Sequence, residues 1–373
     1  MTDLENNVLK IKKSGYFDYL YYYNNRPDVL AAGVDGALHY LQQGWREGVN
    51  PSLQFNTRAY LKEHNPNKCP LIHFIENGEK HKDKYRMDGT SKRDLRSYFK
   101  HKKSRIADTV CYAYISDNYD NLISPKYVCP EWDYVCFTNN KRLINKKYIG
   151  VWKILPSQFE ELDSKRNSGW HKTHPEKLFP NYKKSVWVDA NTNILTDYVI
   201  NEIKTRNSDL LVPIHYERDC IYDECNAVMD CGRDTPDIVS KTKDFLQKSG
   251  MPKNYGLNGT NIIFRKHTNK TIQNIDKLWW YCIKNYSKRD QLSFSYCLYK
   301  HNIKPSDIAI NDTITDFINF YLVYHIQNKK DNQIKITNKT ISYWIKIHIL
   351  CSLIPIKKWR HNARKHINRK YYK

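Results

Sequence analysis

The sequence lacks several patterns that would assign it to common classes of protein. Its ten cysteines form no CxxC pair and no zinc-type spacing, so a structural zinc site is not expected. No run of about 18 uncharged apolar residues occurs, so no membrane-spanning helix is expected. The amino terminus, MTDLENNVLKIKK, lacks the apolar core of a signal peptide. These absences favour a cytoplasmic protein with reduced thiols.

Acidic residues are scarce relative to basic ones. The 373 residues include 61 Lys or Arg but 39 Asp or Glu, which gives a net charge of +22. Such an excess is compatible with nucleic acid, an anionic membrane surface or acidic substrates such as nucleotide diphosphates. A hydrophobic fraction of 40% with 29 tyrosines predicts a packed globular protein, and the length suits two or three structural units.

Basic residues concentrate at the carboxyl terminus, where ten Lys or Arg and no Asp or Glu occur between residues 339 and 373. This tail combines an apolar segment with a basic one, as interfacial membrane anchors do, and Pro355 divides it into two short helices. A solvated basic tail that follows a core helix is the alternative. We expect the tail to lie on the anionic inner face of the cell membrane. Nucleic acid is not expected as a partner, because no recognition module accompanies the charge.

An imperfect repeat of two copies occupies residues 1–82. Tyr22 and His39 in the first copy correspond to Tyr60 and His73 in the second, and both histidines precede a glycine by the same interval. A repeat of this length predicts helical hairpins that stack on a neighbour. Both histidines are interpreted as packed structural residues, with metal binding as the alternative. We expect this small helical repeat module to dock on a partner or on an acceptor.

Beyond a basic linker at 83–105, residues 106–312 alternate short apolar runs with polar or helical stretches, and 313–373 form a basic helical tail. The alternation predicts an α/β domain with a mainly parallel sheet. Strands are predicted at Thr109–Ile115, Tyr134–Phe137, Val151–Leu155, Ser185–Val188, Leu210–Ile214 and Asn261–Phe264. Helices are predicted over 196–206, 237–249 and 271–286, and one begins at Asp290.

Four polar motifs flank these elements. KTHPEKLFP, preceded by Arg166, comes before the strand that ends at Asp189, and HYERDCIYDE follows the next predicted strand. LNGTNIIFRKH contains the last predicted strand, and SKRDQ begins a helix. Open α/β sheets bind ligands at the carboxyl ends of their strands, so we expect these motifs to gather there.

The order and spacing of the motifs resemble those of a known family. RNSGWHKTHPEKLFPNYKKSVWVDANTNI, HYERDCIYDE, NIIFRKH and RDQLSF are similar to the glycosyltransferase-like family of plant mucilage and pectin enzymes and bacterial homologues, formerly a domain of unknown function. This resemblance implies a GT-A-like fold, a Rossmann-type α/β sandwich. It also implies sugar transfer from a nucleotide-sugar donor, for which a UDP-sugar is expected. The first 80 residues resemble a repeat module found beside bacterial surface-polysaccharide glycosyltransferases, which suggests a capsule, O-antigen or lipid-linked glycan as acceptor.

The resemblance also implies site residues. The catalytic candidates are Asp290, to orient hydroxyls or act as base, Gln291, near the anomeric centre, and Asp189. The donor-binding candidates bring charge or polar groups to strand-end loops; they are Asp189, Asn191, Arg166, Lys172, His215, Arg218, Glu224, Arg289 and Thr138.

GT-A enzymes usually hold Mn²⁺ or Mg²⁺ through an Asp-x-Asp at a strand end, since these hard ions prefer oxygen ligands. Here Asp189 and Asn191 take that place, with His267 as a third candidate metal ligand. The structural alternatives are a turn cap for Asp189, a helix N-cap for Asp290, a strand-end cap for His215 and an ion pair with Arg218 for Glu224. The departure from Asp-x-Asp keeps open a non-catalytic glycan-binding or assembly protein that retains the glycosyltransferase fold.

Overall fold

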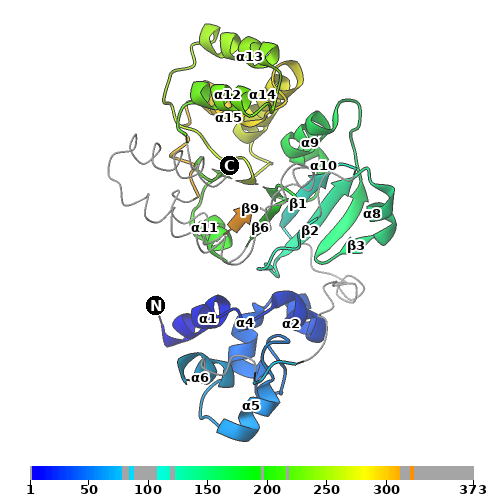
Figure 1. Ribbon diagram of the computed structural model, residues 1–373, viewed down its shortest axis with the longest axis vertical. Helices are drawn as coiled ribbons and strands as arrows, with labels where there is room; N and C mark the ends of the chain where they lie inside the picture. Colours follow the sequence, from blue (N-terminus) through cyan, green and yellow to red (C-terminus); the bar gives the residue numbers. More distant parts are fainter. Residues whose placement is uncertain are drawn as a thin grey trace.

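The structure is a computed structural model that describes residues 2–77, 84–87, 107–117, 122–194, 197–215, 218–310 and 320–322. Within these ranges a helical module at the amino terminus is followed by an α/β domain around a seven-stranded sheet (Figure 1). The predicted mixed α/β class, with a helical region in front of it, is confirmed.

The amino-terminal module consists of short helices joined by tight turns. Several begin at a polar N-cap: Asp18, for example, accepts hydrogen bonds from the amides of Leu20 and Tyr21. The elements are α1 (Asp3–Lys13), α2 (Tyr19–Asn25), α3 (Pro27–Ala31), α4 (Gly36–His39), the π-helix η1 (Tyr40–Gly44), α5 (Thr57–His64) and α6 (Pro70–Asn77).

Each copy of the repeat contains its own polar contact between a histidine and a tyrosine. His39 Nδ1 is 2.8 Å from the Tyr22 hydroxyl, and His73 Nδ1 is 2.7 Å from the Tyr60 hydroxyl. Each histidine is therefore held inside its own copy, as the structural interpretation expects. Among the described residues, no group of three or more His, Cys, Asp or Glu is arranged to hold a metal ion.

The packed module extends beyond the boundary predicted at residue 82. Tyr85 is buried, and its ring packs edge-on against Tyr60 with the centroids 4.9 Å apart. Its carbonyl accepts a hydrogen bond from the Asn56 amide, and the Met87 amide donates to the Leu53 carbonyl. Residues 84–87, assigned to the linker from sequence, therefore belong to the module.

The central sheet has the strand order β3-β4-β2-β1-β5-β8-β7. Its strands are β1 (Thr109–Ile115), β2 (Trp132–Thr138), β3 (Tyr148–Ile149), β4 (Trp152–Pro156), β5 (Lys184–Val188), β7 (Leu210–Leu211) and β8 (Ile262–Arg265). Strands β4, β2, β1 and β5 pair in parallel, whereas β3 and β8 are antiparallel to their neighbours. All six predicted strands occur. The fifth is shorter than predicted because Pro213 has no amide proton, and Val212 and Ile214 form only isolated bridges.

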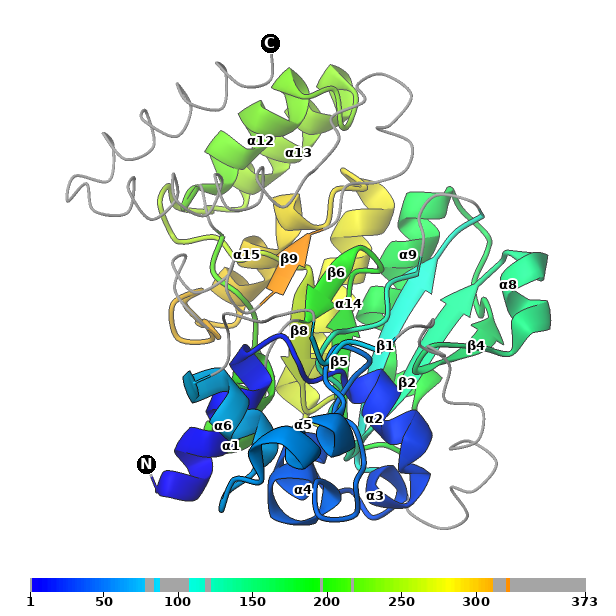
Figure 2. The ribbon, with the colours of Figure 1, turned by 60° about the horizontal axis from the view of Figure 1, so that its bottom comes forward.

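Alternate residues of each strand enter two different cores. In β1, Cys111 and Ala113 face one side while Val110 and Tyr112 face the other. The second side packs against α9 (Ser164–Thr173), and α9 packs in turn against α14 (Lys270–Asn285). The same core extends to α12 (Ile221–Asp230), α13 (Pro236–Lys248) and α15 (Gln291–Lys300), which lie farther from the sheet (Figure 2). The first side packs against α11 (Tyr198–Thr205). The remaining helices are α8 (Lys141–Lys146) and α10 (Pro175–Leu178).

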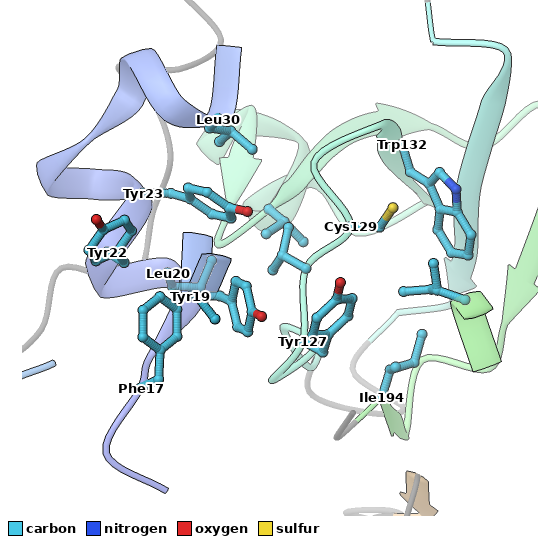
Figure 3. Packing of buried hydrophobic residues seen from close by; sticks show 14 of the residues in the cluster. Phe17, Tyr19, Leu20, Tyr22, Tyr23, Leu30, Tyr127, Cys129, Trp132 and Ile194 are labelled. Carbon is cyan, nitrogen blue, oxygen red and sulfur yellow. The ribbon is translucent and has the colours of Figure 1, made fainter. Parts of the chain in front are cut away.

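The core on the first side continues into the amino-terminal module. Figure 3 shows the junction, where Tyr19 of α2 packs edge-on against Tyr127 with ring centroids 4.8 Å apart. Lys12 of α1 adds ion pairs to Asp35, at 3.2 Å, and to Asp197 at the start of α11, at 2.6 Å. The module therefore docks on the α/β domain of its own chain.

Residues 320–322, inside the predicted helical tail, form a strand. This strand, β9 (Phe320–Leu322), pairs antiparallel with β6 (Thr192–Ile194). The expected membrane-contacting segment, 339–373, lies outside the described residues. No helix in the described ranges is both long and apolar enough to cross a membrane.

A shared core predicts that the module and the sheet unfold together. Leu20 is 1% exposed in this core, so Leu20→Ala should lower the free energy of unfolding by about 3 kcal/mol. Urea unfolding followed by tryptophan fluorescence should show one transition, shifted to lower urea. The matched control is Leu4→Ala, since Leu4 is 43% exposed on α1 and should cost little. A second transition at the wild-type midpoint would contradict a common core.

Candidate active site

One edge of the sheet collects the predicted site residues. Strands β1, β2, β4 and β5 all end at this edge, and β8 begins there because it runs the opposite way. Asp189 follows β5, Thr138 ends β2, and Thr260 lies just before β8. Open α/β sheets bind their ligands at such an edge.

A buried lysine occupies the centre of this edge. Lys172, in the last turn of α9, is 3% exposed, and its Nζ lies 2.5 Å from Asp290 Oδ2 and 3.1 Å from Asp189 Oδ1. The same Nζ donates a hydrogen bond of 3.0 Å to the carbonyl of Thr260. One ammonium thus joins α9, the end of β5, the start of β8 and the start of α15.

Each carboxylate has a second donor. Trp187 and Asp189 are two residues apart and extend from the same face of the strand, so the Trp187 indole Nε1–H reaches Asp189 Oδ1 at 2.7 Å. The Trp187 ring also lies under the ammonium, with its centroid 5.1 Å from Lys172 Nζ. Asp290 Oδ2 accepts a further hydrogen bond of 3.0 Å from the Thr260 hydroxyl.

The short distances between the charged groups determine the ionisation states of Lys172 and Asp290. Burial by itself would lower the pKa of Lys172, but the adjacent carboxylates of Asp189 and Asp290 raise the pKa above its usual value. Burial by itself would raise the pKa of Asp290, but the charges of Lys172, Lys165 and Arg289 hold that pKa well below its ordinary range. Both groups are therefore ionised at neutral pH, and Asp290 is a weak base.

Asp290 serves as helix cap and as ion-pair partner at once. Its Oδ1 accepts a hydrogen bond of 3.2 Å from the Gln291 amide at the start of α15, while its Oδ2 binds Lys172. Its carbonyl accepts the Trp279 indole proton at 2.9 Å. The two interpretations weighed from sequence are compatible, because they use different oxygens of the same carboxylate.

Lys165 is a cation at this edge that the sequence motifs did not single out. It lies on α9 seven residues before Lys172, hence on the same face of the helix about two turns away. Burial and then the charge of Arg289 lower the pKa of Lys165, whereas the carboxylates of Asp290 and Asp189 act in the opposite direction. The sequence signal for Lys165 is its spacing of seven residues from Lys172, because that spacing places both side chains on the same face of a helix.

His215, Arg218 and Glu224 form a second polar group. The Arg218 side chain is hydrogen-bonded to Glu224 Oε2, and its amide donates to His215 Nδ1 at 3.0 Å. Burial, followed by the charges of Arg218 and Arg233, lowers the pKa of His215 to about 3, so this imidazole is neutral. The His215 amide donates to the carbonyl of Leu257, three residues before Thr260. The segment from Leu257 to Thr260 therefore contacts both polar groups.

Arg166 is placed away from Lys172. Its guanidinium donates to the carbonyls of Ile283 and Tyr286 at 3.0 and 2.8 Å and pairs with Asp163 at 2.7 Å. Ile283 lies in the last turn of α14 and Tyr286 is the residue after the helix, so Arg166 anchors the end of α14. The structure does not bring it to the cluster.

Thr138 and Asn191 lie on the expected edge. Thr138 is buried, and its hydroxyl accepts a hydrogen bond from the Asn140 amide at 3.1 Å. Asn191 lies in the turn between β5 and β6, which is closed by a hydrogen bond from the Thr192 amide to the Asp189 carbonyl. Gln291 is the first residue of α15 and is half-buried beside Asp290.

His267 cannot share a metal with Asp189, contrary to the prediction. Val188 pairs with Ile262 and Ser185 with Arg265, so β8 carries His267 toward the opposite edge of the sheet. At about 3.3 Å per residue, roughly 20 Å separate His267 from Asp189. Its Nε2 instead donates to the Tyr182 carbonyl at 2.7 Å.

The residues at this edge do not fit the expected Mn²⁺ or Mg²⁺. The two carboxylates that face a common point, Asp189 and Asp290, already neutralise the ammonium of Lys172. A divalent ion placed between them would stand beside a fixed positive charge, which is unfavourable.

An α/β domain with charged side chains at the carboxyl edge of a mainly parallel sheet is an arrangement that binds a polar or charged ligand. The profile of the TOD1/MUCI70, glycosyltransferase-like domain matches residues 102–316. Because this match covers more than half of the 373 residues, the chain belongs to that family, and the resemblance drawn from the four motifs is confirmed.

Two individual proteins give a coarser comparison. The probable hexosyltransferase MUCI70 of Arabidopsis thaliana is 23% identical over 202 residues, which make up 50% of this chain and 32% of that protein. The chain thus spans about a third of the length of this relative. A solved apo structure of WbbM, a bifunctional glycosyltransferase, aligns with a TM-score of 0.34 and 11% identity over 77% of this chain and 62% of that one.

Removing the Lys172 ammonium should lower the free energy of unfolding, because two nearby carboxylates then lose their counter-charge. Lys172→Met leaves Asp290 buried without its counter-charge and should lower the free energy of unfolding by about 3–5 kcal/mol. Combining it with Asp290→Asn should recover part of this loss, because no buried carboxylate at position 290 then lacks its ion-pair partner. A double-mutant cycle by urea unfolding measures the coupling. Lys177→Met, at an exposed lysine nearby, is the control, and simple additivity would contradict the contact.

Three buried histidines should make the protein sensitive to mild acid. Burial lowers the pKa of His171 and of His174 to about 4, and that of His215 to about 3. His171 Nε2 accepts the Gln158 amide proton at 3.1 Å, so protonation breaks this contact. Between these values and the unfolded pKa of about 6.5, the unfolded chain binds more protons. Stability is therefore full above about pH 6.5 and falls as the pH drops towards the folded pKa values.

Each histidine contributes up to about 1.4 kcal/mol per pH unit in that window. Urea unfolding between pH 7 and 4 measures the slope. His171→Asn should flatten the slope by the share of one histidine, and an unfolding free energy independent of pH between 7 and 5 would contradict this account.

Proposed function

We propose that the chain transfers a sugar from a nucleotide-sugar donor, most simply a UDP-sugar, at the Lys172 edge of the sheet. The observation that carries the proposal is the charged cluster of Lys172, Asp189 and Asp290 at the strand ends of a glycosyltransferase-like domain. Sugar transfer needs positive charge near the departing diphosphate and a carboxylate near a hydroxyl of donor or acceptor.

Asp189 is the carboxylate best placed to meet a substrate. Its side chain is 32% exposed, whereas that of Asp290 is 9% exposed and held by Lys172 and Thr260. Asp189 is therefore assigned to a hydroxyl of donor or acceptor, with its orientation set by Trp187. Asp290 is assigned to positioning, because its low pKa makes it a poor proton acceptor.

For the acceptor we propose a surface glycan such as a capsule or O-antigen chain, either growing or lipid-linked. The supports are the pattern of the first 80 residues and the basic segment 339–373, which would rest on an anionic membrane at the cytoplasmic side. The second candidate function is a non-catalytic glycan-binding or assembly protein. It is favoured by Asn191, which stands where a second Asp would be expected.

A screen of nucleotide sugars for hydrolysis and for thermal stabilisation tests the proposal. We expect one donor to stabilise the protein and to be hydrolysed slowly. Asp189→Asn should reduce the rate by roughly 100-fold or more while the donor still binds. Asp230→Asn, at an exposed carboxylate at the end of α12, should leave both unchanged. If wild type binds a glycan but no nucleotide sugar, the non-catalytic alternative is correct.

A further inference from the structure

The ammonium of Lys172 has no donor left for a ligand. A lysine ammonium has three N–H donors, and three acceptors surround this one: Asp290 Oδ2, the Thr260 carbonyl and Asp189 Oδ1. The side chain is 3% exposed, so it is shielded by protein on all sides. Lys172 therefore acts as a resident cation between two carboxylates, which is the position expected for a divalent metal.

Two further cations surround the same point. Lys165 extends from the first turn of α9, and Arg289 precedes Asp290 at the start of α15. Both act on the carboxylate of Asp290, and Arg289 disfavours the charged form of Lys165. With Lys172, three positive charges face the two negative charges of Asp189 and Asp290, so the cluster keeps an excess of one positive charge.

Neither additional cation is neutralised within the described part of the chain. The Lys165 ammonium and the Arg289 guanidinium form no ion pair there, and Arg289 Nε is buried without a hydrogen-bond partner among those residues. Arg166, the neighbour of Lys165, is by contrast fully engaged by Asp163 and two carbonyls. Two like charges held close together in partly buried positions are unfavourable until an anion joins them.

We propose that Lys165 and Arg289 bind the diphosphate of the donor, and that the resident ammonium of Lys172 replaces the divalent metal at this site. This inference rests on the proposed function. A diphosphate offers several charged oxygens, which match the fork of an arginine and the point charge of a lysine. Binding of the donor, and transfer from it, then need no divalent ion.

The arrangement gives each residue a distinct task. Lys172 holds Asp189 and Asp290 at fixed positions, whereas Lys165 and Arg289 supply the charge that a leaving diphosphate requires. A divalent ion at this point would have to share the carboxylates of Asp189 and Asp290 with the Lys172 ammonium, whose positive charge repels it.

Calorimetric titration with UDP, GDP and ADP tests the proposal on the full chain. One set of titrations contains excess EDTA and another contains excess MnCl₂. We expect one nucleoside diphosphate to bind with the same affinity, within about threefold, in both sets. Arg289→Gln and Lys165→Gln should each weaken this binding by roughly tenfold to a hundredfold. Lys284→Gln, at an exposed lysine in the last turn of α14, is the matched control and should bind as wild type.

A second readout separates binding from a merely structural role. Lys165→Gln removes both the repulsion from Arg289 and the attraction to Asp290 and Asp189, so the melting temperature of the ligand-free protein should change little while binding weakens. A lower melting temperature with unchanged UDP affinity would overturn the role of Lys165. Unchanged affinity in Arg289→Gln would likewise overturn the role of Arg289.

The comparison of titrations in EDTA and in MnCl₂ tests whether Lys172 replaces the divalent metal. Binding that appears only with MnCl₂ would overturn the replacement of the metal by Lys172 and would leave the proposed function intact. If no nucleoside diphosphate binds with either EDTA or MnCl₂, this inference and the proposed function both fail.

Discussion

The buried ammonium of Lys172 is the interaction on which the candidate site depends. It contacts Asp189 after β5, Thr260 before β8 and Asp290 before α15, so three strand or helix ends are fixed relative to α9 by one side chain. A charge taken out of water is costly unless its partners surround it closely. The three acceptors meet this requirement together, which makes the geometry of the edge a single unit rather than a set of independent loops.

The cluster around Lys172 lies at the edge of a sheet whose two faces are both covered by other parts of the chain. Alternate residues of β1 enter two cores, one of which also contains tyrosines of the amino-terminal module. The module thus covers part of one face of the sheet, as helices cover the other face. The ion pairs of Lys12 with Asp35 and Asp197 fix its placement at the boundary. The repeat module, which the sequence predicts to dock on a partner or an acceptor, here shares a core with the α/β domain of its own chain.

Much of the fold follows from local sequence, and the remainder depends on long-range pairing. The six strands were predictable because short β-branched and aromatic runs such as Val186–Val188 favour buried strands. The direction of β8 was not predictable, since apolar runs are the same in either orientation, and this placed His267 at the wrong edge. The motif resemblance named Arg166 and did not name Lys165. The two are adjacent in sequence, and only the phase of α9 decides which one faces the cluster.

The distance along the chain between the members of the central ion pair has a consequence for biosynthesis. Lys172 and Asp290 are separated by 118 residues, so a nascent chain contains the lysine long before its partner exists. At roughly 5–20 residues per second, on the order of ten seconds pass between the two. The charged edge is therefore assembled late, after the strands that carry it have been made. A truncated translation product that ends before Asp290 retains the sheet strands, Asp189 and Thr260 but lacks the buried carboxylate closest to the lysine.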